Sequence, residues 1–311
     1  MNAWARRSAR RSAFRRALPA ACLAGGALTM LYTLLIATAD AITKLFAASY
    51  AAPQLFALSG GIVALLSLVS NRRGGRWRGV RTRCPGAMAV RAGATVLASV
   101  AFFHAFRLLP FAEVFVFIAL IPLLAALLSG PVLGEAVRPQ VWAALIMGSV
   151  GVMFLFPGGL GSVGAGHLVA FAAVLLGTVS MVASRYIGQR DDNILAQVFY
   201  PNLALMAVMA LALPFVFRPM DWGDLGWVCA YAVFLFGARW VLVAALRLLP
   251  AYVVTPLMNL QFLWMVAIGA VAFGEWPAAR VYLGAAILVV AGLWLIRDQA
   301  RPRQAAAVPA E

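Results

Sequence analysis

The sequence predicts an all-α integral membrane protein in which ten transmembrane helices form two inverted five-helix repeats. Of its 311 residues, 64% are hydrophobic and 11% are charged, whereas a soluble domain carries about 25% charged residues. Apolar runs long enough to cross a bilayer recur along the chain, and one motif returns at a fixed distance. Lipid is therefore the expected solvent around most of the chain.

Ten apolar runs are separated by mostly short connections. Their lengths are close to the roughly 18 to 25 residues that a helix needs to cross the hydrocarbon core. They lack the period-two alternation of barrel strands, and a helix satisfies its backbone hydrogen bonds within one segment. The predicted spans are 22–48, 54–70, 87–108, 110–130, 139–156, 167–187, 194–217, 223–246, 250–273 and 278–296.

The net charge of +15 does not indicate nucleic acid as a partner, because the basic residues are not gathered on one surface. Nineteen of the 25 lysines and arginines lie on the side that holds both termini, against three on the opposite side. By the positive-inside rule both termini are cytoplasmic, which requires an even number of spans. We therefore expect a multi-pass protein of the cytoplasmic (inner) membrane. The basic tail would anchor this topology at anionic lipid; the alternative is a transit peptide, because the tail is rich in Arg and Ser and lacks acidic residues.

The strongest pattern is a repeat of six residues at one constant interval. Arg107-Leu108-Leu109-Pro110 recurs as Arg247-Leu248-Leu249-Pro250, and Gly134-Glu135 recurs at the same interval as Gly274-Glu275. Since this repeat interval contains five predicted spans, an odd number, the second copy enters the membrane in the opposite sense to the first. This is the construction of many secondary transporters, whose two halves move around a site near the midplane.

The repeat divides the chain into five segments. These are a cytoplasmic tail (1–20), a first repeat (21–156), an external glycine-rich linker (157–166), a second repeat (167–297) and a cytoplasmic tail (298–311).

Prolines inside spans 4 and 9 predict helix breaks. Pro122 lies closer to Glu135 than Pro256 lies to Glu275, so the two breaks are expected at different depths. A proline frees the carbonyl four residues before it, which is tolerated where protein or a wet cavity satisfies that group. Both prolines are candidate cavity-facing kinks, with a simple packing kink as the alternative.

On these residues the chain resembles the EamA-type transporters of the drug/metabolite transporter superfamily, from about Thr38 to Arg297. The first half carries Asp40-x-x-x-Lys44, Arg91-x-Gly93, Leu109-Pro110, Pro122-Leu123 and Leu133-Gly134-Glu135; the second carries Pro256-x-x-Asn259, Trp264, Gly269, Phe273-Gly274-Glu275-x-Pro277 and Gly292. The pattern is most similar to that of the riboflavin and S-adenosylmethionine uptake group.

The resemblance implies a pore between the two repeats, lined largely by spans 1, 3, 4, 6, 8 and 9, and it implies no cofactor and no ATP. Two departures from the pattern of that group weaken the inference that this chain has the same substrate. That group has an arginine early in span 2, where this chain reads Leu58-Ser59-Gly60, and a tyrosine in place of Asn259.

Charged residues inside spans are the first candidates for substrate binding, since an ionised side chain near the bilayer centre costs about 2.5 to 3.5 kcal/mol. Arg239 could present its fork of donors to an anionic or carbonyl group, or it could snorkel to the nearby cytoplasmic interface. Arg91, at the edge of span 3, is a second candidate. Asp40 and Lys44, four residues apart in span 1, form either a mutually neutralising pair or substrate contacts, and Lys44 is near enough to the external end to snorkel.

Glu113 begins span 4, where an acidic side chain stabilises a helix N-terminus. Alternatively, Glu113 and His104, which lie across a short turn from each other, take up a proton that couples to transport. Glu135 and Glu275 precede spans 5 and 10 and are expected to cap those helices as structural residues.

Span 9 carries a polar and aromatic stripe. Tyr252, Thr255 and Asn259 lie on one face of the predicted helix, and Trp264 shares a neighbouring face with Gln261. Such a stripe suits a planar organic substrate, with packing between helices as the alternative.

A secondary transporter for a small polar or aromatic metabolite accounts best for these features. Riboflavin, an S-adenosylmethionine-like compound and an amino acid are the candidate substrates, the lipid bilayer is the expected surrounding, and a homodimer is left open. The alternative is an intramembrane enzyme or a lipid-handling membrane protein. An enzyme is not expected, because two histidines and three scattered cysteines offer neither a nucleophile set nor metal ligands.

Overall fold

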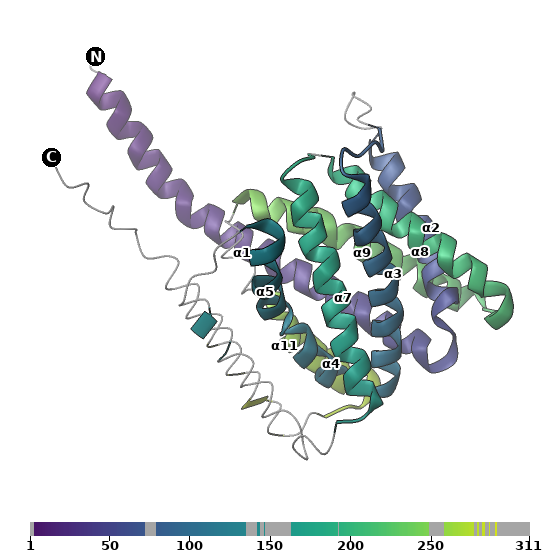
Figure 1. Ribbon diagram of the computed structural model, residues 1–311. Coiled ribbons are helices and arrows are strands. Elements are labelled where there is room, and N and C mark those ends of the chain that lie inside the picture. Colours follow the sequence, from purple (N-terminus) through teal and green to yellow (C-terminus); the bar gives the residue numbers. More distant parts are fainter. Residues whose placement is uncertain are drawn as a thin grey trace.

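The computed structural model describes residues 3–71, 79–134, 163–191, 193–248 and 258–276, with residues 142, 143, 146, 279, 282, 283, 286 and 290. Within these ranges every regular element is a helix (Figure 1). The helices are α1 (Ala3–Ser49), α2 (Ala52–Asn71), α3 (Pro85–Leu108), α4 (Phe111–Ile118), α5 (Ile121–Leu133), α7 (Ala165–Gly188), α8 (Ile194–Val216), α9 (Trp222–Leu248) and α11 (Gln261–Phe273).

Seven segments in this part of the chain are long and apolar enough to cross a membrane. They coincide with predicted spans 1 to 4 and 6 to 8, so these predictions are confirmed. The second half of span 9 is the shorter apolar helix α11. Spans 5 and 10 fall almost wholly outside the described residues.

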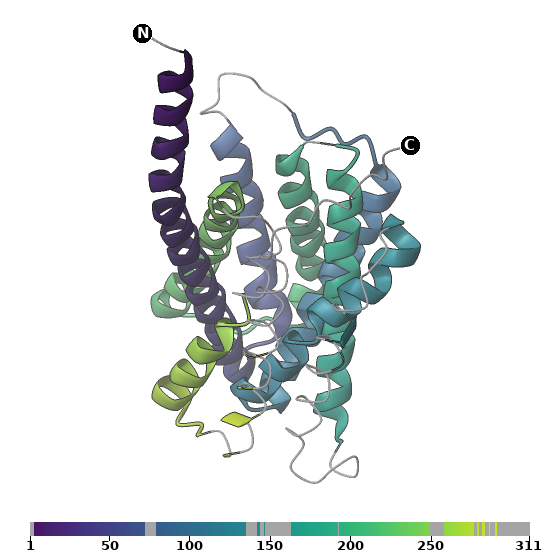
Figure 2. The same ribbon diagram turned by 90° about the vertical axis from the view of Figure 1, so that its left-hand side faces the viewer.

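Helix α1 is 47 residues long, or about 70 Å at 1.5 Å per residue, whereas the hydrocarbon core is about 30 Å thick. Its N-terminal part, which includes the predicted tail, projects beyond the bundle in both views (Figures 1 and 2). The basic tail is therefore helical and continuous with the first span.

Large apolar side chains point outward along the spans. Leu211 and Phe215 on α8 and Val271 on α11 have exposed fractions of 76%, 88% and 88%. An apolar surface of this extent would be unfavourable in water and is the surface that lipid covers. The bundle thus contacts the lipid bilayer.

Span 4 is broken into two helices. Helix α4 ends at Ile118 and α5 begins at Ile121, with Pro122 in its first turn. Proline is tolerated there because a first-turn N–H has no helical partner in any case. A break beside Pro122 is therefore confirmed.

Span 9 is broken at the equivalent position. A turn at Asn259 and Leu260 precedes α11, just as Ala119 and Leu120 precede α5, and the two turns are separated by the repeat interval. The expectation of breaks at different depths is therefore wrong. It assumed that each proline sets its break, whereas in span 9 this turn falls after Pro256, and Pro256 itself lies outside the described residues.

Helices α5 and α11 correspond in length as well as position. Both have 13 residues, and they end at Gly134 (φ 68°) and Gly274 (φ 65°). A left-handed residue at this place terminates a helix, and glycine adopts it without a steric penalty.

The helix pairs follow the same correspondence. The most extensive contacts are between α3 and α7, α2 and α8, and α1 and α9. When each span is replaced by its counterpart in the other repeat, the α3–α7 pair becomes the α9–α1 pair. The α2–α8 pair becomes itself. The α5–α7 contact likewise corresponds to the α1–α11 contact. One cluster of buried apolar residues surrounds the two broken spans, where Phe115 and Phe262 lie 5.1 Å apart between ring centroids.

Candidate functional site

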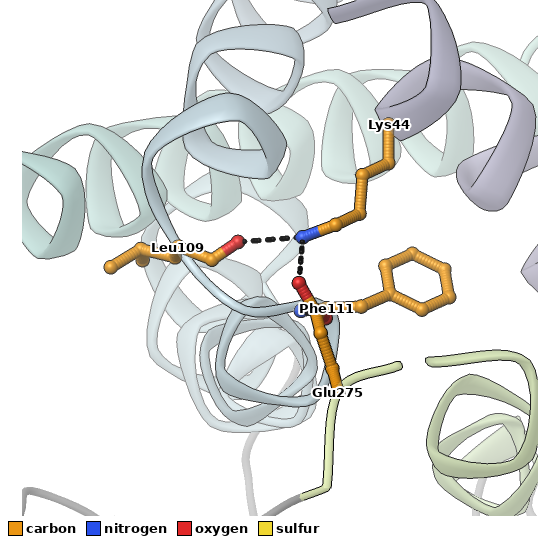
Figure 3. Close-up of polar contacts among 4 residues, drawn as sticks. All are labelled: Lys44, Leu109, Phe111 and Glu275. Carbon is orange, nitrogen blue, oxygen red and sulfur yellow. Dashed lines mark hydrogen bonds and ion pairs between the residues drawn. The ribbon is translucent and has the colours of Figure 1, made fainter. Parts of the chain in front are cut away.

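Lys44 of α1 makes its polar contacts outside its own helix (Figure 3). Its Nζ lies 2.8 Å from Oε1 of Glu275 and donates a 3.0 Å hydrogen bond to the carbonyl of Leu109. The Lys44 side chain is 12% exposed and that of Glu275 is 30% exposed. The predicted Asp40–Lys44 pair is therefore wrong, because the partner of Lys44 comes from the second half of the chain.

Glu275 caps a helix that the sequence did not associate with it. Its Oε2 accepts a 2.8 Å hydrogen bond from the backbone N–H of Phe111, the first residue of α4 (Figure 3). A carboxylate at this position satisfies an otherwise unpaired N–H and interacts favourably with the positive end of the helix. Glu275 thus joins the end of α11 to α1 and to the start of α4, while capping of span 10 remains a prediction outside the described residues.

Asp40 contacts α11 instead. Its Oδ2 accepts a 2.9 Å hydrogen bond from Nε2 of Gln261, the first residue after the break in span 9, whose exposed fraction is 6%. One turn further along α11, Nε1 of Trp264 donates a 3.1 Å bond to Oγ1 of Thr33. Two polar contacts therefore link α1 with α11. Sequence reasoning considered Gln261 only as a neighbour of Trp264, because a single glutamine in an apolar run gives little signal.

Arg239 of α9 is a charged group whose donors are incompletely satisfied by the described residues. Its side chain is partly buried, and its Nη1 is buried without a hydrogen-bond partner among the described residues. Tyr32 and Tyr231 interact electrostatically with both Arg239 and Asp40, and Tyr231 forms a side-chain hydrogen bond with Thr43. Sequence reasoning missed both tyrosines, since an aromatic residue in a span usually packs.

Arg91 is held by backbone carbonyls. Its Nε donates to Gln197 and its Nη1 to Ser180, each at 3.2 Å, and Thr95 bonds the Ser180 hydroxyl at 2.7 Å. These contacts fasten α3 to α7 and α8. The guanidinium has a structural role here, and substrate contact by Arg91 stays a prediction.

Glu113 faces a different histidine from the one predicted. Its Oε2 lies 3.8 Å from Nε2 of His167, whose Nδ1 accepts a 3.0 Å bond from the N–H of Gly164. His104 is exposed, and its Nδ1 is bonded to the Val100 carbonyl of its own helix at 2.8 Å. The Glu113–His104 pairing is therefore wrong, because Glu113 faces α7 whereas His104 bonds within α3.

The remaining candidates are only partly described. Asn259 lies in the turn before α11, where its carbonyl accepts from the N–H of Phe262 at 3.1 Å. Tyr252, Thr255, Pro256 and Glu135 lie outside the described residues.

Comparison with known proteins gives one named relative. No family model matches the chain. The chain is 28% identical to a riboflavin transporter of Rhizobium johnstonii over 244 residues, which are 76% of this chain and 75% of that protein. A solved crystal structure of a protein is similar over 91% of this chain and 99% of its own, with a TM-score of 0.62 and 23% identity. The latter similarity concerns the fold alone.

The apolar helices define a multi-pass helical membrane protein. Together with the similarity to a transporter, they support a membrane transporter.

Proposed function

We propose that this protein is a secondary transporter that moves a small polar metabolite across the cytoplasmic membrane, as EamA-type transporters do. Its ten spans form two inverted five-helix repeats, with both termini in the cytoplasm. The observation that carries this proposal is the equivalence of α5 and α11, which are separated by the repeat interval and have the same length, a turn before them and a left-handed glycine after them.

The equivalence supports an inverted arrangement because five spans separate equivalent positions. Polar contacts also show which connections lie at the same end of the helix bundle. Gln54 bonds the backbone of Arg218, joining the start of α2 to the loop after α8. At the other end Asp191 accepts from the N–H of Arg83, joining the loops after spans 2 and 6.

In an alternating-access mechanism, polar contacts between the two halves of the chain can hold one side of the protein closed. We define the external latch as Lys44, Glu275, the Leu109 carbonyl and the Phe111 N–H. An opening to the outside between α1 and α11 has to break this latch. Asp40, which accepts from Gln261 of α11, lies one turn before Lys44 on α1. The latch therefore stabilises the externally closed state.

Riboflavin is the first substrate to test, since a relative is named for its transport. The experiment is riboflavin flux, followed by fluorescence, in proteoliposomes with the purified protein, beside protein-free liposomes and a panel of amino acids and nucleosides. Saturable uptake or exchange of any panel member supports transport. Flux equal to that of protein-free liposomes for every compound, with folded protein in the vesicles, contradicts it.

A further inference from the structure

Arg239 carries a charge that forms no ion pair with a carboxylate among the described residues. A guanidinium stays protonated in proteins, so burial cannot remove its charge. Snorkelling would bring the whole group to the aqueous interface, but Nη1 is buried and unpaired among the described residues. A charged donor in this state is unfavourable unless something else supplies an acceptor.

The carboxylates of the neighbouring spans are engaged elsewhere. Glu275 pairs with Lys44, Glu113 faces His167, and Asp40 accepts from Gln261. Among the described residues, Tyr32, Tyr231 and Arg91 interact electrostatically with Arg239. Arg91 adds a second positive charge, and its donors already reach two backbone carbonyls.

The unpaired Nη1 of Arg239 and the nearby guanidinium of Arg91 distinguish between ligands. A neutral carbonyl would satisfy the free Nη1 but leave the charge uncompensated. A carboxylate would do both, since it accepts from the planar guanidinium fork and carries the opposite charge.

We propose that Arg239 binds the carboxylate of a small organic acid, and that this acid is the transported substrate. Tyr32 and Tyr231 interact with both Arg239 and Asp40, so a basic and an acidic side chain share one polar region. A substrate with a donor or ammonium group opposite its carboxylate fits this arrangement, as an amino acid does. The identity of the ligand as a substrate rests on the proposed function; the anion site itself does not.

The test compares acids with their own amides on the purified full-length protein. Thermal stability is measured with phenylalanine and phenylalaninamide, with nicotinate and nicotinamide, and with a wider set of such pairs, because a ligand that binds the native form raises its apparent stability. The variants are Arg239→Gln, which removes the charge, Arg239→Lys, which keeps it without the fork, and Arg107→Gln, a matched change at an exposed arginine.

At least one acid should stabilise the wild type and the Arg107→Gln variant with an apparent affinity roughly ten- to a hundredfold above that of its amide. Arg239→Gln should abolish this preference and Arg239→Lys should retain part of it. Equal effects of acid and amide on wild type, or a preference that survives Arg239→Gln, would overturn the proposal. If Arg239→Gln does not fold, the wild-type and Arg239→Lys comparisons decide.

Flux in proteoliposomes separates this inference from the proposed function. Acid preference in binding without flux of the bound acid supports the anion site and contradicts transport. Flux of riboflavin or another neutral compound, with no acid preference, supports transport and contradicts the anion site.

Discussion

Lys44 and Glu275 join the two halves of the molecule at one end through a contact of 2.8 Å. The two residues lie far apart in the sequence, and each has a second partner, the Leu109 carbonyl for Lys44 and the Phe111 N–H for Glu275. All four groups are thereby satisfied in a largely apolar setting. In the alternating-access cycle that we propose, this latch would hold the external side closed.

Weakening the latch should favour the externally open state. Glu275→Gln removes the charge, and a hydrogen bond to a charged group is worth about 1.5 to 3 kcal/mol. Ala37, a fully buried residue one turn below Asp40, is replaced by cysteine in a background without Cys22, Cys84 and Cys229. An impermeant thiol reagent should then label Ala37→Cys from outside roughly tenfold faster in the Glu275→Gln protein.

Two variants make this measurement specific. Glu275→Asp, which keeps the carboxylate that pairs with Lys44 and accepts from Phe111, should be labelled more slowly than Glu275→Gln, whereas Asp191→Asn, at the other end of the bundle, should leave labelling unchanged. Equal labelling with and without Glu275→Gln would show that the latch does not control access.

Arg91 and Arg239, which are both partly buried, should respond oppositely to the loss of their charge. Arg91→Gln removes two hydrogen bonds to carbonyls of α7 and α8 and should destabilise the ligand-free protein by about 2 to 4 kcal/mol. Arg239→Gln removes a charge whose Nη1 has no partner among the described residues, so the melting temperature should stay the same or rise. A larger loss for Arg239→Gln than for Arg91→Gln in a thermal unfolding experiment would refute this assignment.

Any proton coupling at the external end should depend on His167 and not on His104. His167 faces Glu113 at 3.8 Å, whereas His104 bonds its own helix. Transport should therefore lose its dependence on an imposed pH gradient in Glu113→Gln and His167→Gln proteins and keep it in His104→Gln. A gradient dependence that disappears with His104 alone would contradict the structure.

Gly60 and Gly61 offer a matched pair for the contact between α2 and α8. A Cβ at Gly60 would lie 2.9 Å from the carbonyl oxygen of Asn202 and 3.1 Å from the backbone nitrogen of Met206. At Gly61 the nearest atom is the flexible Sδ of Met206, at 3.0 Å. Gly60→Ala should destabilise by about 1 to 3 kcal/mol, and Gly61→Ala by far less. Similar melting temperatures for the two variants would rule out close packing at Gly60.

Seven spans could be placed from the sequence because length and hydropathy decide which segments cross a bilayer. The repeat interval could be read as well, since the Gly-Glu pairs keep their spacing, and Gly134 and Gly274 do end equivalent helices. The depth of the break in span 9 could not be predicted from the sequence. Proline was the helix-breaking residue on which the prediction relied, whereas the turn falls at Asn259 and Leu260, neither of which is a proline.

The pairing of charges could not be predicted for a different reason. The sequence analysis paired residues that are close in the sequence, namely Asp40 with Lys44 and Glu113 with His104, because spacing along a helix predicts only local contacts. The partners in the structure, Gln261, Glu275 and His167, come from the other half of the chain. Which residues meet across the interface depends on how the halves dock, and a single sequence does not contain that information.

The inverted construction can be tested at two equivalent positions just beyond the glycine caps. Ala136 and Trp276 each follow a repeated Gly-Glu pair, and the Trp276 side chain is 79% exposed. In the cysteine-free background, Ala136→Cys and Trp276→Cys are labelled in intact cells with an impermeant thiol reagent. Trp276→Cys should react at once and Ala136→Cys only after permeabilisation; reaction of both from the same side would mean that the halves are parallel.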